Sequence, residues 1–411
     1  MRTVEPRKHH SEQARSAENK RARYGEDIDL NTYLKSSDEH PYEESLSHLP
    51  AQTREQMLQA GVMTDDDIQR SGTIIQMDHS IIHNVSKQEG IEIMGTYEAI
   101  EKYDWLADYF WKAVPVDSDK YTAHVDMNES NGYFIRALPG SQSQYPLQAC
   151  LYMAKAKLAQ NVHNIIIAEE GSRLDIITGC TASTGNEPGL HLGVSEFYIK
   201  KGAQVSFTMI HNWSPEIDVR PRTGIIVEEG GVFLNNYVIM KPVHSLQTNP
   251  LARCTGNDAT VRFNSIIVAT PGSSMDMGSQ VMLNGEGSRT EIISRAITTG
   301  GDIVARGYIE GNAPGVKGHL ECRGLILKGE GMIHAIPELK GTLAGIDLSH
   351  EAAVGKIAEE EVEYLMMRGL TRDEATSTIV RGFLRVDIEG LPPELSAELK
   401  RAVEASEKDI M

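Results

Sequence analysis

The stretch IIIAEEGSRLDII at residues 165–177 joins an apolar run, a tight polar turn at Gly171 and a second run of alternating apolar residues. The same pattern recurs as EFYIKKGAQVSFTMI (196–210), GIIVEEGGVFLNNYVIM (224–240), LARCTGNDATVRFNSIIV (251–268), QVMLNGEGSRTEIISRAI (280–297) and YIEGNAPGVKGHLECRGLIL (308–327). The turn residues are separated by 31, 28, 29, 28 and 28 residues, and they are Gly171, Gly202, Gly230, Ala259, Gly287 and Gly315. A fixed period of this size is typical of repeat architectures, and the strand character of both runs predicts a β-solenoid.

The sequence shows no helical pattern between the repeats from Val162 to Leu327. Parallel strands joined by crossover helices are therefore excluded, because each such connection needs a helix. Stacked coils remain, in which each coil covers the open edge of the coil before it. A β-sandwich is an alternative because it also contains many short strands, but it does not by itself predict a steady spacing.

The chain divides into three regions. Residues 1–90 are expected to be mostly helical, with a helix over residues 50–60 that Gly61 closes. The first 24 residues carry seven basic and three acidic side chains, which favours a flexible, solvated arm, with a docking arm as the alternative. Residues 91–345 form the predicted β core, and residues 346–411 form a second helical region.

The helical region at the C-terminal end has a recognisable start signal. Thr371 and Glu374 have the spacing of a capping box, which predicts a helix through about Phe383. Helices at the end of a solenoid either cover its exposed edge or bind a partner.

Composition limits the possible partners and locations. The net charge of −18 and the pI of about 5.3 argue against nucleic acid, which is bound through clustered Lys and Arg. No apolar run approaches the about 18 residues of a membrane span, and the N-terminus does not resemble a secretory signal. We therefore expect a cytoplasmic protein whose four cysteines, which form no CxxC pair, are free thiols.

Several catalytic motifs are missing. No GxxxxGK[ST], GxSxG or HExxH occurs, and no GxGxxG follows a strand. We therefore expect no nucleotide hydrolysis by a phosphate-binding loop and no activity of the hydrolase or zinc-protease kind.

Three residues near the end of the core have side chains that bind metals. Cys322 lies in a predicted strand, while His350 and Glu351 lie where the last strand is expected to give way to helix. Thiolate, imidazole and carboxylate together suit iron–sulfur species, copper or zinc. Each also has a structural interpretation, since a strand cysteine is often a small core residue and a Ser-His-Glu triplet often caps a helix. Cys180 lies 142 residues before Cys322, about five repeats away, on the same or the opposite wall.

Four segments are similar to the SufB/SufD family of the SUF system for iron–sulfur cluster assembly, and most similar to SufB-type proteins of the short form found in archaea and anaerobes. They are NVHNIIIAEEGSRLDIITGC (161–180), LGVSEFYIKKGAQVSFTMIHNW (192–213), GHLECRGLIL (318–327) and SHEAAVGKIAEEEVEYLMMRGLTRDEATSTIVRGF (349–383). The resemblance covers about residues 85–390. It implies a right-handed parallel β-helix between helical ends, and a scaffold, rather than an enzyme, on which a transient iron–sulfur cluster forms.

The resemblance also implies partners. The SufC ATPase docks on the C-terminal helical region, here about residues 352–383. A second copy of the chain, or a SufD-like paralogue, pairs through the last coils. A sulfur donor and acceptor apoproteins complete the set.

Residue roles follow from the same resemblance. Cys322 matches the leading cluster ligand at the subunit interface, and His350 and Glu351 match a His-Glu pair beside it, preceded here by Ser349 in place of the usual Glu. Cys180 matches a cysteine that receives sulfur and passes it along the interior of the β-helix.

His211 and Trp213 match polar and aromatic positions that line this path, although His211 replaces a Gln found in some relatives. Two other functions stay open: a SufD-like structural partner of the ATPase without its own cluster, and a β-helix protein acting on carbohydrate. The aromatic content of 6% disfavours a sugar-stacking face. Cluster type, sulfur donor, the identity of the second copy and flavin binding also stay open.

Overall fold

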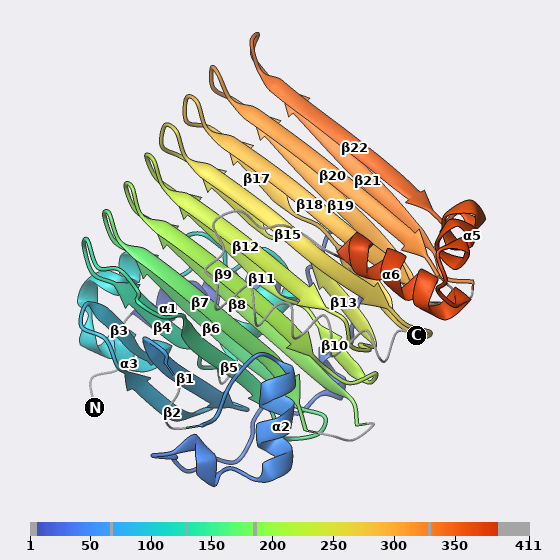
Figure 1. Cartoon of the computed structure of the whole chain (residues 1–411). Coiled ribbons are helices and arrows are strands. Elements are labelled where there is room, and N and C mark those ends of the chain that lie inside the picture. Colours follow the sequence, from blue (N-terminus) through green and yellow to red (C-terminus); the bar gives the residue numbers. More distant parts are fainter. Residues whose placement is uncertain (1–5, 66–68, 129, 184–186, 328–329, 385–411) are drawn as a thin grey trace.

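The computed structural model describes the chain except for residues 1–5, 66–68, 129, 184–186, 328–329 and 385–411. Strands make up 45% of the chain and helices 17%, and the strands wind into a parallel β-solenoid of about 7 turns (Figure 1). The β-solenoid prediction is confirmed, and no helix interrupts the described residues between 162 and 327.

Two sheets form the walls of the solenoid. The first sheet has ten strands, in the order β2 (Ser80–Ser86), β1 (Gly72–Met77), β5 (Leu147–Met153), β7 (Arg173–Ala182), β9 (Gln204–Asn212), β12 (Val232–Ile239), β15 (Thr260–Ala269), β18 (Arg289–Thr298), β20 (Lys317–Ile326) and β22 (Asp347–Gly355). Only β1 and β2 pair antiparallel in it, since the other pairs run parallel.

The second sheet has twelve strands and shorter segments. Its order is β10 (Ile217–Val219), β13 (Ser245–Thr248), β16 (Ser274–Met277), β19 (Asp302–Gly311), β17 (Gln280–Leu283), β14 (Leu251–Cys254), β11 (Arg222–Val227), β8 (Gly189–Ile199), β6 (Ala159–Ala168), β4 (Tyr133–Ala137) and β3 (Ile91–Gly95), and β21 (Ile333–Gly341) also pairs with β19. The last coil therefore consists of β21 and β22, and each pairs with the preceding coil along one edge.

One corner of the solenoid explains the sequence period. Gly171, Gly202, Gly230 and Gly287 have φ between +65° and +70°, a region that costs glycine little. The backbone N–H of each donates to a carbonyl in the turn of the next coil, at 2.8–3.0 Å. In the fourth repeat the residue in this conformation is Asp258 (φ +55°), not the predicted Ala259, because aspartate tolerates left-handed backbone better than alanine. The corner is thus a hydrogen-bonded column along the solenoid axis.

The N-terminal region differs from the prediction at both ends. Helix α1 (Pro6–Ala17) packs on α4 (Lys120–Met127), and Ala14 and Ala17 are buried there. The prediction of a flexible arm is therefore wrong for the described part of this segment, while residues 1–5 of that prediction lie outside the described residues. The helix predicted over residues 50–60 is confirmed as α2 (Ala51–Gln59), and Gly61 follows it with φ +79°.

From Gly72 onward the chain forms β1 and β2 rather than helix, because these apolar residues complete the first sheet. The short helices η1 (Leu30–Thr32), η2 (Leu46–His48), α3 (Thr96–Lys102) and η3 (Asp104–Asp108) lie outside the coils.

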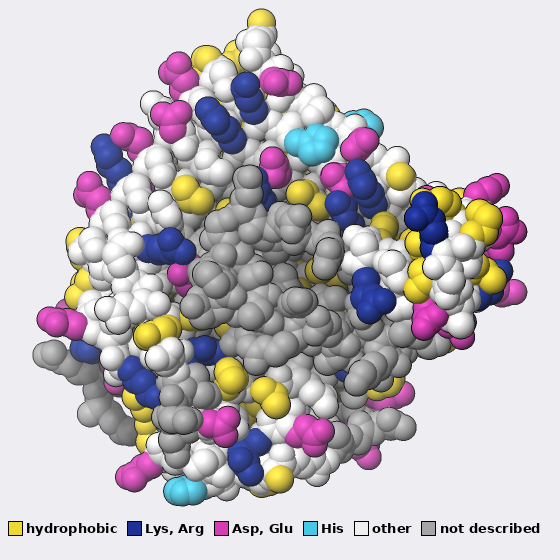
Figure 2. All heavy atoms as spheres, viewed as in Figure 1, with side chains coloured by type: hydrophobic (Ala, Val, Ile, Leu, Met, Phe, Trp, Pro, Cys, Tyr) yellow, Lys and Arg dark blue, Asp and Glu magenta, His cyan; other side chains and the backbone are white. Residues whose placement is uncertain are grey.

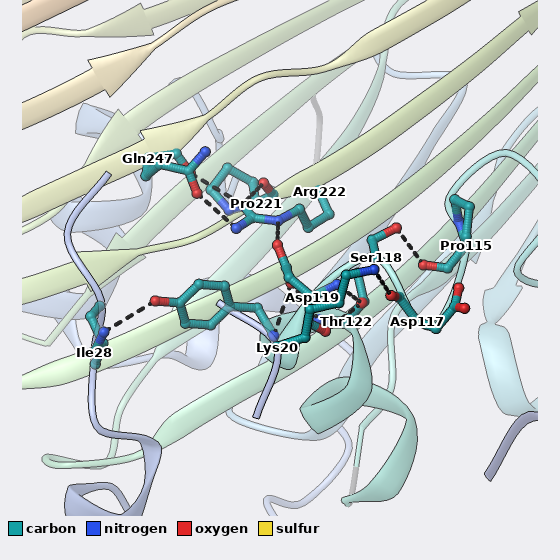
Figure 3. Close-up of polar contacts among 11 residues, drawn as sticks. Lys20, Ile28, Pro115, Asp117, Ser118, Asp119, Thr122, Pro221, Arg222 and Gln247 are labelled. Carbon is teal, nitrogen blue, oxygen red and sulfur yellow. Dashed lines mark hydrogen bonds and ion pairs between the residues drawn. The ribbon is translucent and has the colours of Figure 1, made fainter. Parts of the chain in front are cut away.

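The segment after α1 is fastened to the second sheet by polar contacts (Figure 3). Lys20 Nζ donates to the carbonyl of Asp117, just before α4, at 2.8 Å. Asp119, the N-cap of α4, in turn pairs with Arg222 of β11 at 2.7 Å. Further along, the Tyr33 hydroxyl donates to Asp218 of β10 at 2.7 Å. Lys20 therefore serves docking within the chain.

The C-terminal region begins later than predicted. Residues 347–355 form strand β22, so His350 and Glu351 lie within a strand and not at a helix start. The register explains this: the segment continues the ladder of β20 residue for residue. Helices α5 (Glu359–Met367) and α6 (Arg372–Leu384) follow, and the predicted capping box is present, with the Glu374 N–H donating to Thr371 Oγ1 at 3.3 Å and the Thr371 N–H donating to the Glu374 carboxylate at 2.7 Å.

In the described part of the chain, no helix is both long enough and apolar enough to cross a membrane.

Candidate functional site

Cys322 lies on the inner face of β20 and is only 2% exposed. Its cross-strand partners are Ser294 on β18 and Ala352 on β22. Burial raises the pKa of the thiol to about 11, and the neighbouring Glu321 carboxylate adds to this rise. The thiol is therefore protonated at neutral pH and sits one strand away from the open end of the solenoid.

The other two predicted metal ligands point to opposite faces of β22. His350 pairs with Leu320 and so shares the inner face with Cys322, one strand away and two residues along. Glu351 pairs with Glu321, which places it on the outer face. Both are exposed because β22 is the last strand of its sheet. Cys322 and His350 can therefore contribute to one site, whereas Glu351 belongs to another surface of this protomer.

Glu351 joins a cluster on the outer face with His319 and Glu321, whose ligand atoms lie within 4.8 Å of one another. Arginines already pair with the carboxylates: Arg323 lies 3.0 Å from Glu321 and 3.8 Å from Glu351, and Arg295 also contacts Glu321. These charges offset the carboxylates, so the cluster is an ion-pair network in this form of the protein. His319 and Glu321 were not predicted, and their signal in the sequence is their alternation with Cys322 in GHLECRG.

Cys180 lies on the inner face of β7 and is fully buried. It stands on the same wall as Cys322, five strands earlier in the order β7, β9, β12, β15, β18, β20, which settles the question that the sequence left open. With about 4.8 Å between strands, the two thiols are about 24 Å apart along the axis. Burial raises the pKa of the Cys180 thiol well above its usual value.

His211 is the cross-strand partner of Cys180, and the indole N–H of Trp213 donates to His211 Nδ1 at 2.6 Å. Both side chains are buried. Burial lowers the pKa of His211 well below its usual value, and His191 adds to this effect, so the imidazole is neutral.

Two small cavities, each of about 30 Å³, follow one another inside the solenoid. His211 lines the first and Ser294 lines the second, and the two share lining residues: Asn235, Tyr237, Thr248, Pro250 and Phe263. The two cavities thus lie between His211, the strand partner of Cys180, and Ser294, the strand partner of Cys322, although neither cysteine lines them. A volume of this size holds about one water-sized group.

Fold and site together define a parallel β-solenoid with two buried thiols on one inner wall and an uncovered final coil beside the second. Residues 151–383 match the SUF system FeS cluster assembly, SufBD core domain. The chain is 50% identical over 401 residues to an iron–sulfur cluster assembly SufBD family protein of Methanothermobacter thermautotrophicus, covering 96% of this chain and 98% of that one.

Two further relatives carry the same family name. One from Archaeoglobus fulgidus is 52% identical over 358 residues, which is 87% of this chain and 96% of the relative. One from Pyrococcus horikoshii is 31% identical over 367 residues, which is 88% of this chain and 82% of the relative. The chain belongs to the SufBD family of iron–sulfur cluster assembly proteins, which confirms the family predicted from its segments.

Proposed function

We propose that this protein is a scaffold on which a nascent iron–sulfur cluster forms from iron and sulfur delivered as substrates. The observation that carries the proposal is that Cys322 and His350 share the inner face of the last two coils, next to an edge that nothing in the described chain covers. Thiolate and imidazole are both ligands of iron–sulfur centres.

A second subunit completes the site in this proposal. Strands β21 and β22 leave unpaired backbone edges, which are templates for pairing with another chain. Another copy of this chain, or a SufD-like paralogue, would bring its own ligands to the same edge. Glu351 then contributes from the outer face to the rim of the interface.

Cys180 is the proposed sulfur acceptor, and the interior cavities are the space through which sulfur reaches Cys322. The inner wall between them carries the small polar side chains of Ser265 and Ser294, and His211 and Trp213 line its start. Because both thiols are protonated at rest, a bound metal or an opening of the last coil is needed to favour the thiolate.

Helices α5 and α6 are the proposed docking site of the SufC ATPase. Tyr364, Met366 and Met367 on α5 are 52%, 40% and 78% exposed, and Figure 2 shows hydrophobic side chains among charged ones on this lobe at the right of the view. Such exposed apolar groups suit a protein partner. Nucleotide hydrolysis belongs to that partner, and this chain performs no chemistry on the nucleotide.

Movement of α5 and α6 can be transmitted to the coils of the solenoid. Val380 of α6 is buried against the outer face of the first sheet, in a cluster with Val238, Ile266 and Leu325. A groove of about 770 Å³ separates parts of α5 and α6 from the end of β20, lined by residues such as Ile326, Leu327 and Ile357. The groove leaves room for the helix pair to shift when the ATPase does.

Anaerobic reconstitution with ferrous iron and sulfide tests the scaffold role. We expect charge-transfer absorbance in the visible that Cys322→Ser abolishes and that Cys150→Ser, a buried cysteine on the outer side of the first sheet, leaves intact. Cluster uptake by Cys322→Ser equal to that of the unchanged chain would refute Cys322 as a ligand. Failure of the unchanged chain to take up a cluster, alone and with the ATPase, would favour a structural, SufD-like role.

A further inference from the structure

Two buried polar groups near Cys180 have no hydrogen-bond partner among the described residues: Nε2 of His211 and the hydroxyl of Tyr237. His211 is 2% exposed, and the two rings lie 4.6 Å apart between centroids. Buried polar atoms nearly always have a hydrogen-bond partner. Two such atoms without a partner that line the same small cavity therefore indicate a binding site for a small group.

Both groups are hydrogen-bond donors toward that cavity. Trp213 Nε1–H is a donor without acceptor capacity, so its 2.6 Å contact requires an unprotonated Nδ1 on His211. The neutral imidazole therefore carries its proton on Nε2, and the Tyr237 hydroxyl adds a second donor. His211 and Tyr237 both line the first interior cavity, of about 30 Å³.

Cys180 stands next to these donors. It is the direct cross-strand partner of His211 in the β7–β9 pair, and Met209 and Tyr237 are partners in the next pair. Burial raises the pKa of Tyr237 well above its usual value, and Cys180 adds to this rise. Neither donor bonds the bare thiol sulfur, whereas a persulfide extends the side chain by one S–S bond of about 2.05 Å.

Among its described lining residues, the cavity provides no charged side chain that would stabilise an anion. Its lining contains no Lys, Arg, Asp or Glu among the residues described there, and its neutral members include Asn235, Phe207 and Thr223. An anionic sulfur at this position must therefore be held by neutral donors, as a developing oxyanion is held by preorganised N–H and O–H groups.

We propose that His211 Nε2–H and the Tyr237 hydroxyl form a two-donor pocket that holds the terminal sulfur of a persulfide on Cys180, and that Trp213 positions His211 for this task. The inference rests on the proposed role of Cys180 as sulfur acceptor, and it adds the groups that retain the sulfur. His211 and Tyr237 touch the sulfur, while Trp213 acts through His211.

Persulfide retention by the full-length chain tests this pocket. The reduced protein is incubated anaerobically with sodium tetrasulfide: the Cys180 sulfur attacks a polysulfide sulfur, a new S–S bond forms, one polysulfide S–S bond breaks, and the shortened polysulfide leaves with the electron pair while the thiol proton passes to it. After removal of the reagent, samples are alkylated in denaturant over time, and mass spectrometry follows the extra sulfur on the Cys180 peptide.

We expect Tyr237→Phe and His211→Leu each to reduce the retained sulfur on Cys180 by about tenfold, the effect of losing one hydrogen bond to a charged acceptor. His211→Gln restores an N–H donor and should retain sulfur within about threefold of the unchanged chain, which a purely structural role for the ring would not produce. Trp213→Phe keeps an aromatic ring at this position but removes the indole N–H that fixes the proton of His211 on Nε2. This variant should show an intermediate loss of retained sulfur.

Tyr152→Phe is the matched control, because this buried tyrosine lies one strand away on β5 but donates outward to Gln56 at 2.7 Å. If all variants retain equal amounts of sulfur on Cys180 at unchanged unfolding temperatures, the proposed pocket is overturned. The two donors would then bind a buried water instead. Absence of sulfur on Cys180 in the unchanged chain would overturn its role as acceptor as well. If Tyr237→Phe does not fold, the comparison of His211→Leu with His211→Gln decides the matter alone.

Discussion

At the scale of single residues, burial on the inner face of the first sheet determines the protonation states of the candidate site residues. Cys180 and Cys322 are both thiols in an apolar wall, and burial favours their protonated form. His211 is neutral for the same reason. These three groups are therefore uncharged at rest, which is the state from which the proposed sulfur transfer and cluster assembly would start.

The raised pKa of Cys322, about 11, predicts how stability depends on pH. The unfolded chain releases this proton near the ordinary thiol value, below the folded pKa, so the contribution is complete at neutral pH and is lost as pH rises through about 9 to 11. Relative to Cys322→Ser, the unchanged chain should lose up to about 2 kcal/mol more over this window. Urea unfolding at several pH values measures the difference, and parallel curves for the two proteins would contradict it.

At the scale of elements, the corner turns and the strand ladder determine one another. The positive-φ corner residues from Gly171 to Gly287 direct their N–H groups to the next coil, so the turn column and the sheets share one register. That register decides that Cys322 faces inward and Glu351 outward, since a shift of one residue exchanges the two faces.

Gly202→Ala measures the free-energy cost of placing a residue other than glycine at a positive φ in one corner turn. The added Cβ meets no atom within 4 Å, so the expected loss of about 1 kcal/mol in the free energy of unfolding comes from φ +65° alone. Asp258→Gly should be neutral or stabilising by about 0.5 kcal/mol for the same reason. Gly355→Ala is the control, because that glycine has open space and no positive φ, and it should change stability by less than about 0.5 kcal/mol. Denaturant unfolding of the three variants checks the order.

At the scale of the whole molecule, the two ends of the solenoid are different. The hairpin β1–β2 and the helix α2 lie at the beginning, in the lower part of Figure 1, whereas the segment after α1 runs along the second sheet as far as Arg306 of β19. The final coil leaves β21 and β22 exposed, and the large apolar side chains near it that are exposed include Met332, Leu343 and Val354. This asymmetry supports the proposal that a second subunit pairs at the end that carries Cys322 and His350.

Val354→Lys should weaken self-association or pairing with a paralogue by at least about tenfold, because it places a charge at the exposed edge of β22, where Val354 is 43% exposed. Light scattering after size-exclusion chromatography measures the assembly state over a range of concentrations. Leu58→Lys on α2, at the other end and 56% exposed, is the control and should change nothing. Unchanged assembly of Val354→Lys would place the interface elsewhere.

The sequence alone determined the solenoid, because a period near 28 residues recurs wherever a coil must repeat its turn, and it also determined the family through short local motifs. Helix α2 and the capping box of α6 were equally readable, since they depend on neighbouring residues. The tertiary structure decided that α1 docks, that residues 347–355 continue the ladder as a strand, and that Tyr237 stands beside His211. These features depend on which residues pair between coils that are about 28 residues apart in the sequence. The local sequence does not indicate which side chains meet after that pairing.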